Sequence, residues 1–124
     1  MPKKATKTEK RLLGTWLSDR QRTLKELRFR PGSSRKSREW LRASFGHLRL
    51  TYTRHQIRTI LKDFRSTDAY EVLASDANSV AIRWYCKPTD EWDIRHLHFQ
   101  GQDRYWVSYG YHREWFKRIH TNKG

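Results

Sequence analysis

The sequence holds a single cysteine, Cys86, among its 124 residues. One thiol cannot form an internal disulfide, and without a second cysteine there is no zinc ribbon and no paired redox site. Glycine and proline are also few, at six and three residues, and the glycines stand apart from one another. A glycine-rich loop that cradles phosphate is therefore absent. These absences exclude disulfide scaffolds, cysteine zinc modules and P-loop proteins, and we expect Cys86 to be a small buried apolar residue.

Long apolar runs are missing as well. The N-terminal segment offers only Leu12 and Leu13 as a large apolar pair before Gly14, too little for a signal peptide or a membrane span. We therefore expect a cytoplasmic protein. Apolar residues make up only 35% of the chain, but it has six tryptophans, six tyrosines and five phenylalanines. Each such ring removes roughly 150–250 Å² from water, which predicts one folded domain at 9–120, between polar tails at 1–8 and 121–124.

Positive charge is unevenly distributed along the chain. The formal net charge is +14; residues 1–65 carry 19 lysines and arginines against 5 aspartates and glutamates, whereas residues 66–124 carry 8 of each kind. A field of this sign attracts polyanions at long range and weakens with salt. The same charge is also consistent with a basic surface that is merely solvated.

Two short helices are predicted in the basic half. Asp19 is a good N-cap for the first, which should end before Pro31. The second covers residues 34–45, with Trp40 and Phe45 on an inner aromatic face and arginines on an outer stripe.

From residue 47 the periodicity becomes two, because Leu48, Leu50 and Tyr52 alternate with polar residues. With a first strand at 11–17, further strands are expected at 57–64, 70–74, 80–85, 92–99, 105–109 and 115–119, and turns at 65–68, 75–78, 87–90 and 100–103. These turns are too short for the crossover helices that parallel pairing requires. We therefore predict a mainly β fold, a small antiparallel up-and-down barrel of about eight strands with the two helices between its first and second strands.

The stretch Leu13-Gly14-Thr15-Trp16 resembles the Gly-x-Trp signature that opens the first strand in the calycin superfamily, which includes lipocalins and fatty-acid-binding proteins. A helix pair after that strand is similar to the element order of the fatty-acid-binding branch. The resemblance implies that Trp16 packs beneath a basic side chain from the last strand, with Arg118 as first candidate and Arg113 as second. Gly14, Trp16 and Arg118 then form a structural signature. The Arg-x-Tyr pair that holds a fatty-acid carboxylate in that branch is not found near the C-terminus.

Inside such a barrel we expect a small apolar or anionic ligand, lined by Trp84, His96, His98 and Tyr105. A barrel of about eight strands is only just wide enough to be filled by side chains or to hold one small ligand, so a filled interior is the alternative. Residues two apart on a strand share a face, so His96 and His98 are also candidates for binding zinc or haem iron. Candidates for a third ligand are His47, His55, His112 and His120.

Acidic residues gather at one predicted turn, where Asp90, Glu91 and Asp93 follow one another closely. Carboxylates at a turn are ordinarily solvated, and no nucleophile with a flanking base can be assigned to them. The sequence therefore predicts a binding protein and not an enzyme.

The basic helices favour a second interpretation. Two adjacent helices with cations on their outer sides present a surface to phosphates, which the lysines of the N-terminal tail extend. The helical residues concerned are Arg20, Arg22, Lys25, Arg28, Arg35, Arg38 and Arg42. Because recognition-helix and RNA-binding motifs are absent, the contact is expected to be independent of base sequence. The partner is then nucleic acid, another polyanion or an acidic protein.

Overall fold

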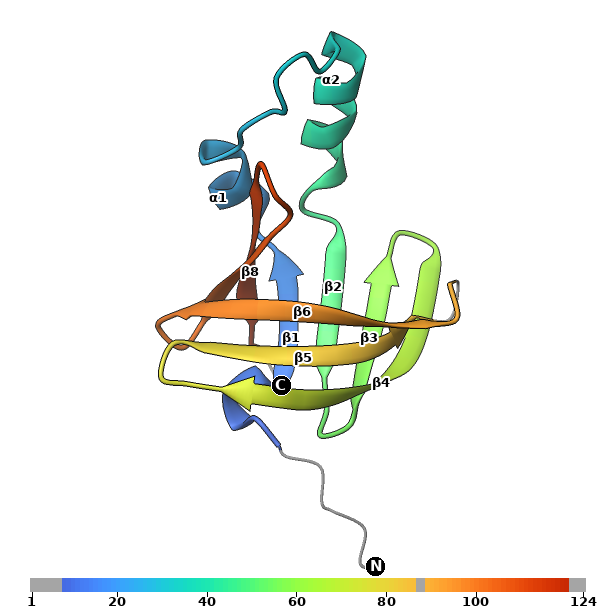
Figure 1. Cartoon of the computed structure of the whole chain (residues 1–124), viewed down its shortest axis with the longest axis vertical. Coiled ribbons are helices and arrows are strands. Elements are labelled where there is room, and N and C mark those ends of the chain that lie inside the picture. The colour runs from blue at the N-terminus through green and yellow to red at the C-terminus, as the bar shows by residue number, and fades with distance from the viewer. Residues whose placement is uncertain (1–7, 87–88, 121–124) are drawn as a thin grey trace, which may run out of the picture.

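The chain folds into a closed barrel of eight antiparallel strands (Figure 1). The computed structural model describes residues 8–86 and 89–120. Each strand pairs with the next along the chain, and the last pairs with the first, where Trp16 lies opposite Arg118. This confirms the expected mainly β barrel with two helices between its first and second strands. The tails expected at 1–8 and 121–124 lie, except for residue 8, outside the described residues.

The elements follow one another with short connections. A 3-10 helix, Lys10–Leu12, precedes β1 (Gly14–Ser18), α1 (Arg20–Lys25) and α2 (Arg35–Ser44). The remaining strands are β2 (Leu48–Tyr52), β3 (Gln56–Leu61), β4 (Phe64–Ser75), β5 (Ser79–Cys86), β6 (Glu91–Gln100), β7 (Arg104–Ser108) and β8 (Arg113–Ile119). The first strand therefore begins three residues later than predicted, because the 3-10 helix takes up the residues before it.

The β3–β4 hairpin also differs from the prediction. Leu61 pairs with Phe64, so the chain reverses at Lys62 and Asp63, inside the strand predicted at 57–64. Lys62 has a φ of 55°, the left-handed conformation that tight hairpins use. The turn predicted at 65–68 is wrong, since these residues lie within β4. Their serine, threonine and aspartate side chains are typical of turns, but here they alternate between the two faces of a strand.

Aromatic rings fill one half of the barrel interior. The largest buried side chains there, each at most 2% exposed, are Trp16, Tyr52, Tyr70, Tyr105 and Phe116. The Tyr105 ring packs between two others, with centroid distances of 4.7 Å to Trp16 and 4.9 Å to Phe116. In this half, the interior is filled by side chains.

The 3-10 helix closes the barrel at the end where Trp16 lies. The indole Nε1 of Trp16 donates to the Leu12 carbonyl oxygen at 2.9 Å, and the Leu12 side chain is itself fully buried. Arg118, and not Arg113, covers Trp16, with its guanidinium carbon 4.3 Å from the ring centroid. Gly14 has a φ of 120°, and a Cβ there would lie 2.9 Å from Nη1 of Arg118. Glycine is therefore needed at this position for both its backbone conformation and its size.

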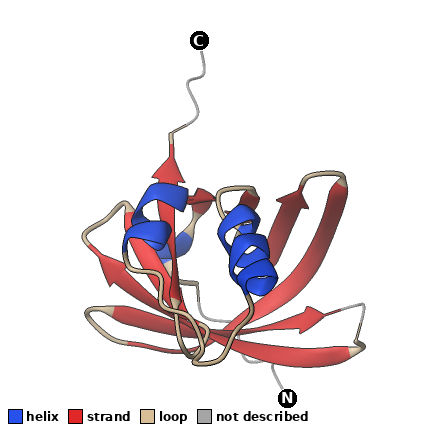
Figure 2. Cartoon of the chain, turned by 90° about the horizontal axis from the view of Figure 1, so that it is seen from above, coloured by secondary structure: helices blue, strands red, loops and turns tan. Residues whose placement is uncertain are grey.

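The helices stand at the opposite end of the barrel (Figure 1), and the view from above in Figure 2 shows them in front of the strands. α1 begins after its N-cap Asp19 and packs on β8, where the Thr23 hydroxyl accepts from the Trp115 backbone N–H at 2.9 Å. α2 buries none of its residues and projects away from the barrel rim in Figure 1. Among the described residues, no helix is long and apolar enough to cross a membrane.

α2 departs from the prediction at Trp40, whereas Leu41 and Ser44 of the expected inner face are partly buried. Trp40, expected on an inner face, is 72% exposed, and only Phe45, just beyond the helix, is buried. The arginines expected on the outer stripe are exposed, and two of them also cover a ring, with the guanidinium carbons of Arg38 and Arg42 lying 5.2 and 5.0 Å from the Phe29 ring centroid. The segment between the helices supplies the ring against which α2 packs, and guanidinium groups stack favourably on such a ring.

Candidate ligand-binding site

A cavity of about 200 Å³ remains in the half of the barrel that faces the helices. It is bounded by inward side chains of β2 to β6, of which the apolar ones include Leu48, Leu50, Ile57, Phe64 and Trp84, and the polar ones Thr59, Ser66, Asp68 and Arg95. Cys86 also lines this cavity and is only partly buried, so it is not the fully buried residue expected from the sequence. The interior is therefore filled at one end and hollow at the other.

Arg95 is a charged residue of the barrel interior. It lies opposite the fully buried Ile82 in the β5–β6 register, which directs its side chain inward. Its guanidinium carbon lies 4.3 Å from the centroid of the Trp84 ring. Within residues 8–86 and 89–120, no carboxylate forms an ion pair with it. Burial acts to lower the pKa of Arg95, but neighbours led by Tyr109 and Tyr52 outweigh it and raise that pKa, so the group is positively charged.

Tyrosine hydroxyls lie near this cation. Those of Tyr52 and Tyr105 are hydrogen-bonded to each other at 3.0 Å, and burial raises the pKa of both. Burial also raises the pKa of Tyr109, in the β7–β8 turn, to about 12. These hydroxyls are therefore neutral at physiological pH, so they provide dipoles to Arg95 and no counter-charge.

Glu114 is a buried carboxylate of the same barrel end. It accepts from the Ser18 hydroxyl at 2.6 Å, and that hydroxyl oxygen accepts from the Gly46 backbone N–H at 3.0 Å. These bonds join β8, β1 and the segment before β2. Burial raises the pKa of Glu114, and neither the Ser18 hydrogen bond nor the Arg95 charge cancels that effect. Ionisation of Glu114 therefore lowers the stability of the folded state.

Replacing Glu114 by glutamine is expected to stabilise the protein at neutral pH and to leave its stability at acid pH unchanged. Because the folded-state pKa of Glu114 lies above its ordinary value of 4.5, the folded state binds the proton more tightly than the unfolded chain. The free energy of unfolding of the wild type therefore falls as pH rises from the ordinary pKa of glutamate through the raised folded-state pKa of Glu114. The variant keeps an acceptor for Ser18 and carries no charge, so it does not show this loss. Urea unfolding at about pH 4 and about pH 8 measures the difference. An equal effect of the substitution at both pH values would contradict it.

The structure separates the four residues expected to line the ligand site. Trp84 lines the cavity, and Tyr105 lies in the ring cluster beside it. His96 and His98 point outward, because the residue between them, Leu97, is fully buried in the core. The prediction that both histidines face the interior is therefore wrong, since it assumed the opposite alternation along β6.

His96 and His98 form a ring pair on the outer surface. Their centroids are 4.1 Å apart, and His98 stacks on Trp106 at 4.0 Å. His96 Nε2 is also hydrogen-bonded to the Ser79 hydroxyl at 2.9 Å. In the part of the chain that the structure describes, no group of three or more potential ligands is arranged to hold a metal ion. Among the described residues, the other histidines do not complete a zinc site with this pair.

The basic residues expected to form one polyanion face lie in different environments. Arg20 donates to backbone carbonyls at the rim, Arg22 pairs with Glu26 at 2.8 Å, and Arg35 pairs with the next turn of α2 at 3.2 Å. The exposed members outside these contacts are Lys25, Arg28, Arg38 and Arg42.

Arg95 and Glu114 are functional candidates that the sequence patterns did not reveal. Arg95 lies two residues before Leu97, and Glu114 two residues before Phe116, so each continues a stripe of buried residues along its strand. A charged residue in line with an apolar stripe is the signal that identifies such a group.

Comparisons with protein-family models, with curated proteins and with solved structures found no match. The interpretation of the site therefore rests on its own geometry, which is a largely apolar cavity whose lining also includes the Arg95 guanidinium and the Asp68 carboxylate.

Proposed function

We propose that this chain is a calycin-like binding protein that holds a small anionic ligand with an apolar body inside its barrel. Arg95 carries the proposal, because its guanidinium faces the interior with no ion pair to a carboxylate of the described residues. An interior charge without an ion pair is costly, and an anionic ligand would offset that cost. The contact between Arg118 and Trp16, next to Gly14, resembles the calycin signature and supports the same superfamily.

The cavity sets the size and chemistry of the proposed ligand. A volume of about 200 Å³ is somewhat larger than the roughly 150 Å³ of an apolar cavity that binds benzene. One aromatic ring or a short alkyl chain therefore fits against Leu48, Phe64 and Trp84. The guanidinium of Arg95 suits a carboxylate, to which it can donate two parallel hydrogen bonds. The proposed role is binding without catalysis, since a guanidinium and neutral hydroxyls hold an anion without transferring its protons.

Benzoate tests the proposal, with benzyl alcohol as its uncharged match. The wild type is expected to bind benzoate more tightly, and Arg95→Met to weaken benzoate binding about 10-fold or more, because a hydrogen bond to a charged group contributes roughly 1.5–3 kcal/mol. Binding of benzyl alcohol should change little. Isothermal titration calorimetry measures all four affinities.

Arg83→Met is the matched control. Arg83 lies on β5 outside the cavity lining, where it pairs with Glu71 at 2.8 Å and covers the Trp92 ring. Its loss removes the same charge and should leave benzoate binding unchanged. Equal affinity for benzoate and benzyl alcohol, or equal losses in the two arginine variants, would count against an anion site at Arg95. The native mass of the purified protein identifies any ligand that it retains.

A further inference from the structure

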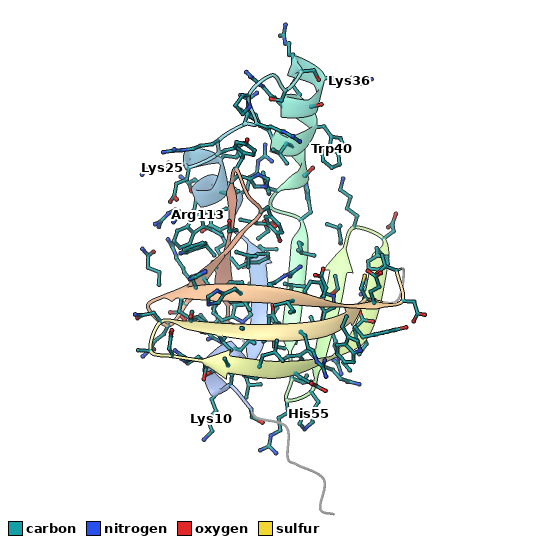
Figure 3. All side chains as sticks on the ribbon, in the orientation of Figure 1. Lys10, Lys25, Lys36, Trp40, His55 and Arg113 are labelled. Atoms are coloured by element: carbon teal, nitrogen blue, oxygen red, sulfur yellow. The ribbon has the colours of Figure 1, made fainter. Side chains whose placement is uncertain are left out.

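A groove of about 710 Å³ lies on the outside of the barrel, between the α1 region and the β7–β8 turn. Lys25 and Arg28 line it on the α1 side, Trp106 and Arg113 on the sheet side, and Tyr111 at the turn. Figure 3 shows Lys25 and Arg113 on the same side of the molecule. The groove shares no lining residue with the cavity inside the barrel.

A stack of flat side chains ends in this groove. His98 stacks on Trp106, with ring centroids 4.0 Å apart and planes inclined by only 12°, and the tilted ring of His96 lies 4.1 Å away at 42° to that of His98. Arg113 continues the stack, with its guanidinium carbon 4.1 Å from the Trp106 ring centroid. Arg113 is exposed, and nucleic-acid bases stack on guanidinium planes as they do on aromatic rings. The stack can therefore accept one more flat group from the groove.

A second hollow, of about 290 Å³, adjoins the groove along Arg28 and Tyr111, which line both. Tyr111 is 55% exposed, so much of its ring is available. Farther along, Phe29 lies against the guanidinium groups of Arg38 and Arg42. Rings and cations therefore alternate along one surface, from β6 past the β7–β8 turn to α2. We call this surface the outer track, and it consists of His98, Trp106, Arg113, Tyr111, Lys25, Arg28, Phe29, Arg38 and Arg42.

Positive charge dominates the outer track. The carboxylate that lines the groove, Glu26, is already paired with Arg22 at 2.8 Å. Lys25, Arg28 and Arg113 form no ion pair with any residue in the two described segments. Unpaired cations beside exposed flat groups favour a ligand that carries both phosphates and unpaired bases.

We propose that the outer track binds single-stranded nucleic acid. Bases stack on the Arg113 end of the ring stack and on Tyr111, while Lys25 and Arg28 contact phosphates. A duplex leaves these stacking groups without a partner, because its bases already stack on one another. An acidic protein would use the cations but not the stack. Recognition is tolerant of sequence, because every base has a π face.

Fluorescence anisotropy with a labelled oligothymidylate of about 12 nucleotides tests the proposal. Trp106→Ala is expected to weaken binding roughly 5-fold or more, the usual effect of removing one stacking group. The matched control is Trp92→Ala, because Trp92, which is 46% exposed, also lies beneath an arginine, Arg83 at 4.5 Å. This variant should bind like the wild type.

A second pair of variants does not depend on a partly buried ring. Lys25→Gln combined with Arg28→Gln is expected to reduce the slope of log affinity against log salt by roughly 1.4, because each phosphate contact on a single strand contributes about 0.7. Arg54→Gln combined with Arg58→Gln removes two exposed charges elsewhere and should change this slope much less.

Three results would overturn the proposal. In the first, a matched duplex or polyglutamate binds as tightly as the single strand. In the second, Trp106→Ala and Trp92→Ala have equal effects on affinity. In the third, the two double variants have equal salt slopes. Benzoate binding reports on the cavity separately, and Trp106→Ala should leave it unchanged. Failure of the outer track and failure of the barrel site are therefore distinguishable.

Discussion

Replacing Trp16 by alanine is expected to lower the free energy of unfolding by about 3–5 kcal/mol, the usual cost of truncating a buried tryptophan. The Trp16 side chain is 0% exposed, packs 4.7 Å from the Tyr105 ring and donates to the Leu12 carbonyl. Alanine leaves a cavity, removes the donor for that carbonyl and exposes the inner side of Arg118. Since small domains have roughly 5–15 kcal/mol of stability in total, the variant should approach the limit of folding.

Urea unfolding followed by circular dichroism measures this loss. Trp40→Ala is the matched control, because Trp40 is the same residue type with 72% exposure, and its loss should change stability by about 0.5 kcal/mol or less. Trp16→Phe keeps a ring in the core and should lie between the two. Similar unfolding midpoints for the Trp16 and Trp40 alanine variants would show that Trp16 does not hold the closed end of the barrel together.

The barrel is predictable from the sequence because most of its strands carry a local signal. Leu50 and Tyr52 alternate with polar residues, and both are buried inside the barrel. The turns expected near 75–78 and 100–103 separate strands in the structure as well. The β3–β4 hairpin is the exception, because its reversal depends on the backbone of Lys62, a residue that does not signal a turn by its type.

The direction of side chains is harder to predict than the strands themselves. Along β6, His96 and His98 share one face, whereas Arg95 and Leu97 share the other. The histidines suggested a binding face, but pairing with the buried residues of β5 directs Arg95 inward instead. A similar limit applies to Trp40, because helical periodicity groups residues on a face without indicating which of them the rest of the protein covers.

The interior changes character along the barrel axis, and this change links stability to the proposed function. Trp16 and Phe116 pack without exposed surface at the closed end. The rings of Tyr52 and Tyr105 belong to this core, whereas their hydroxyls are bonded to each other and lie near Arg95. Hydrophobic burial at one end thus supports a cation and a cavity at the other, where we propose that the ligand binds.

Arg118 connects separate segments at the closed end. Its Nη1 and Nη2 atoms donate to the carbonyl oxygens of Leu13 and Arg11, both at 2.7 Å. Nη2 also donates to the Gln102 carbonyl at 3.1 Å, and Nε donates to the Asp103 carboxylate at 3.2 Å. One side chain of β8 therefore holds the segment before β1 and the β6–β7 turn.

Replacing Arg118 by methionine is expected to lower the free energy of unfolding by about 3 kcal/mol, because hydrogen bonds from a charged donor contribute roughly 1.5–3 kcal/mol each and methionine restores only packing on Trp16. Arg118→Lys should lie in between, since an ammonium does not reproduce the planar fork that reaches two carbonyls. Lys117→Met removes the same charge from an exposed neighbour and should cost about 0.5 kcal/mol or less. Urea unfolding measures these losses, and faster amide hydrogen exchange at Leu12 and Leu13 in the Arg118 variants would locate them at the 3-10 helix. If Arg118→Met costs no more than Lys117→Met, the hydrogen bonds of Arg118 do not hold the closed end.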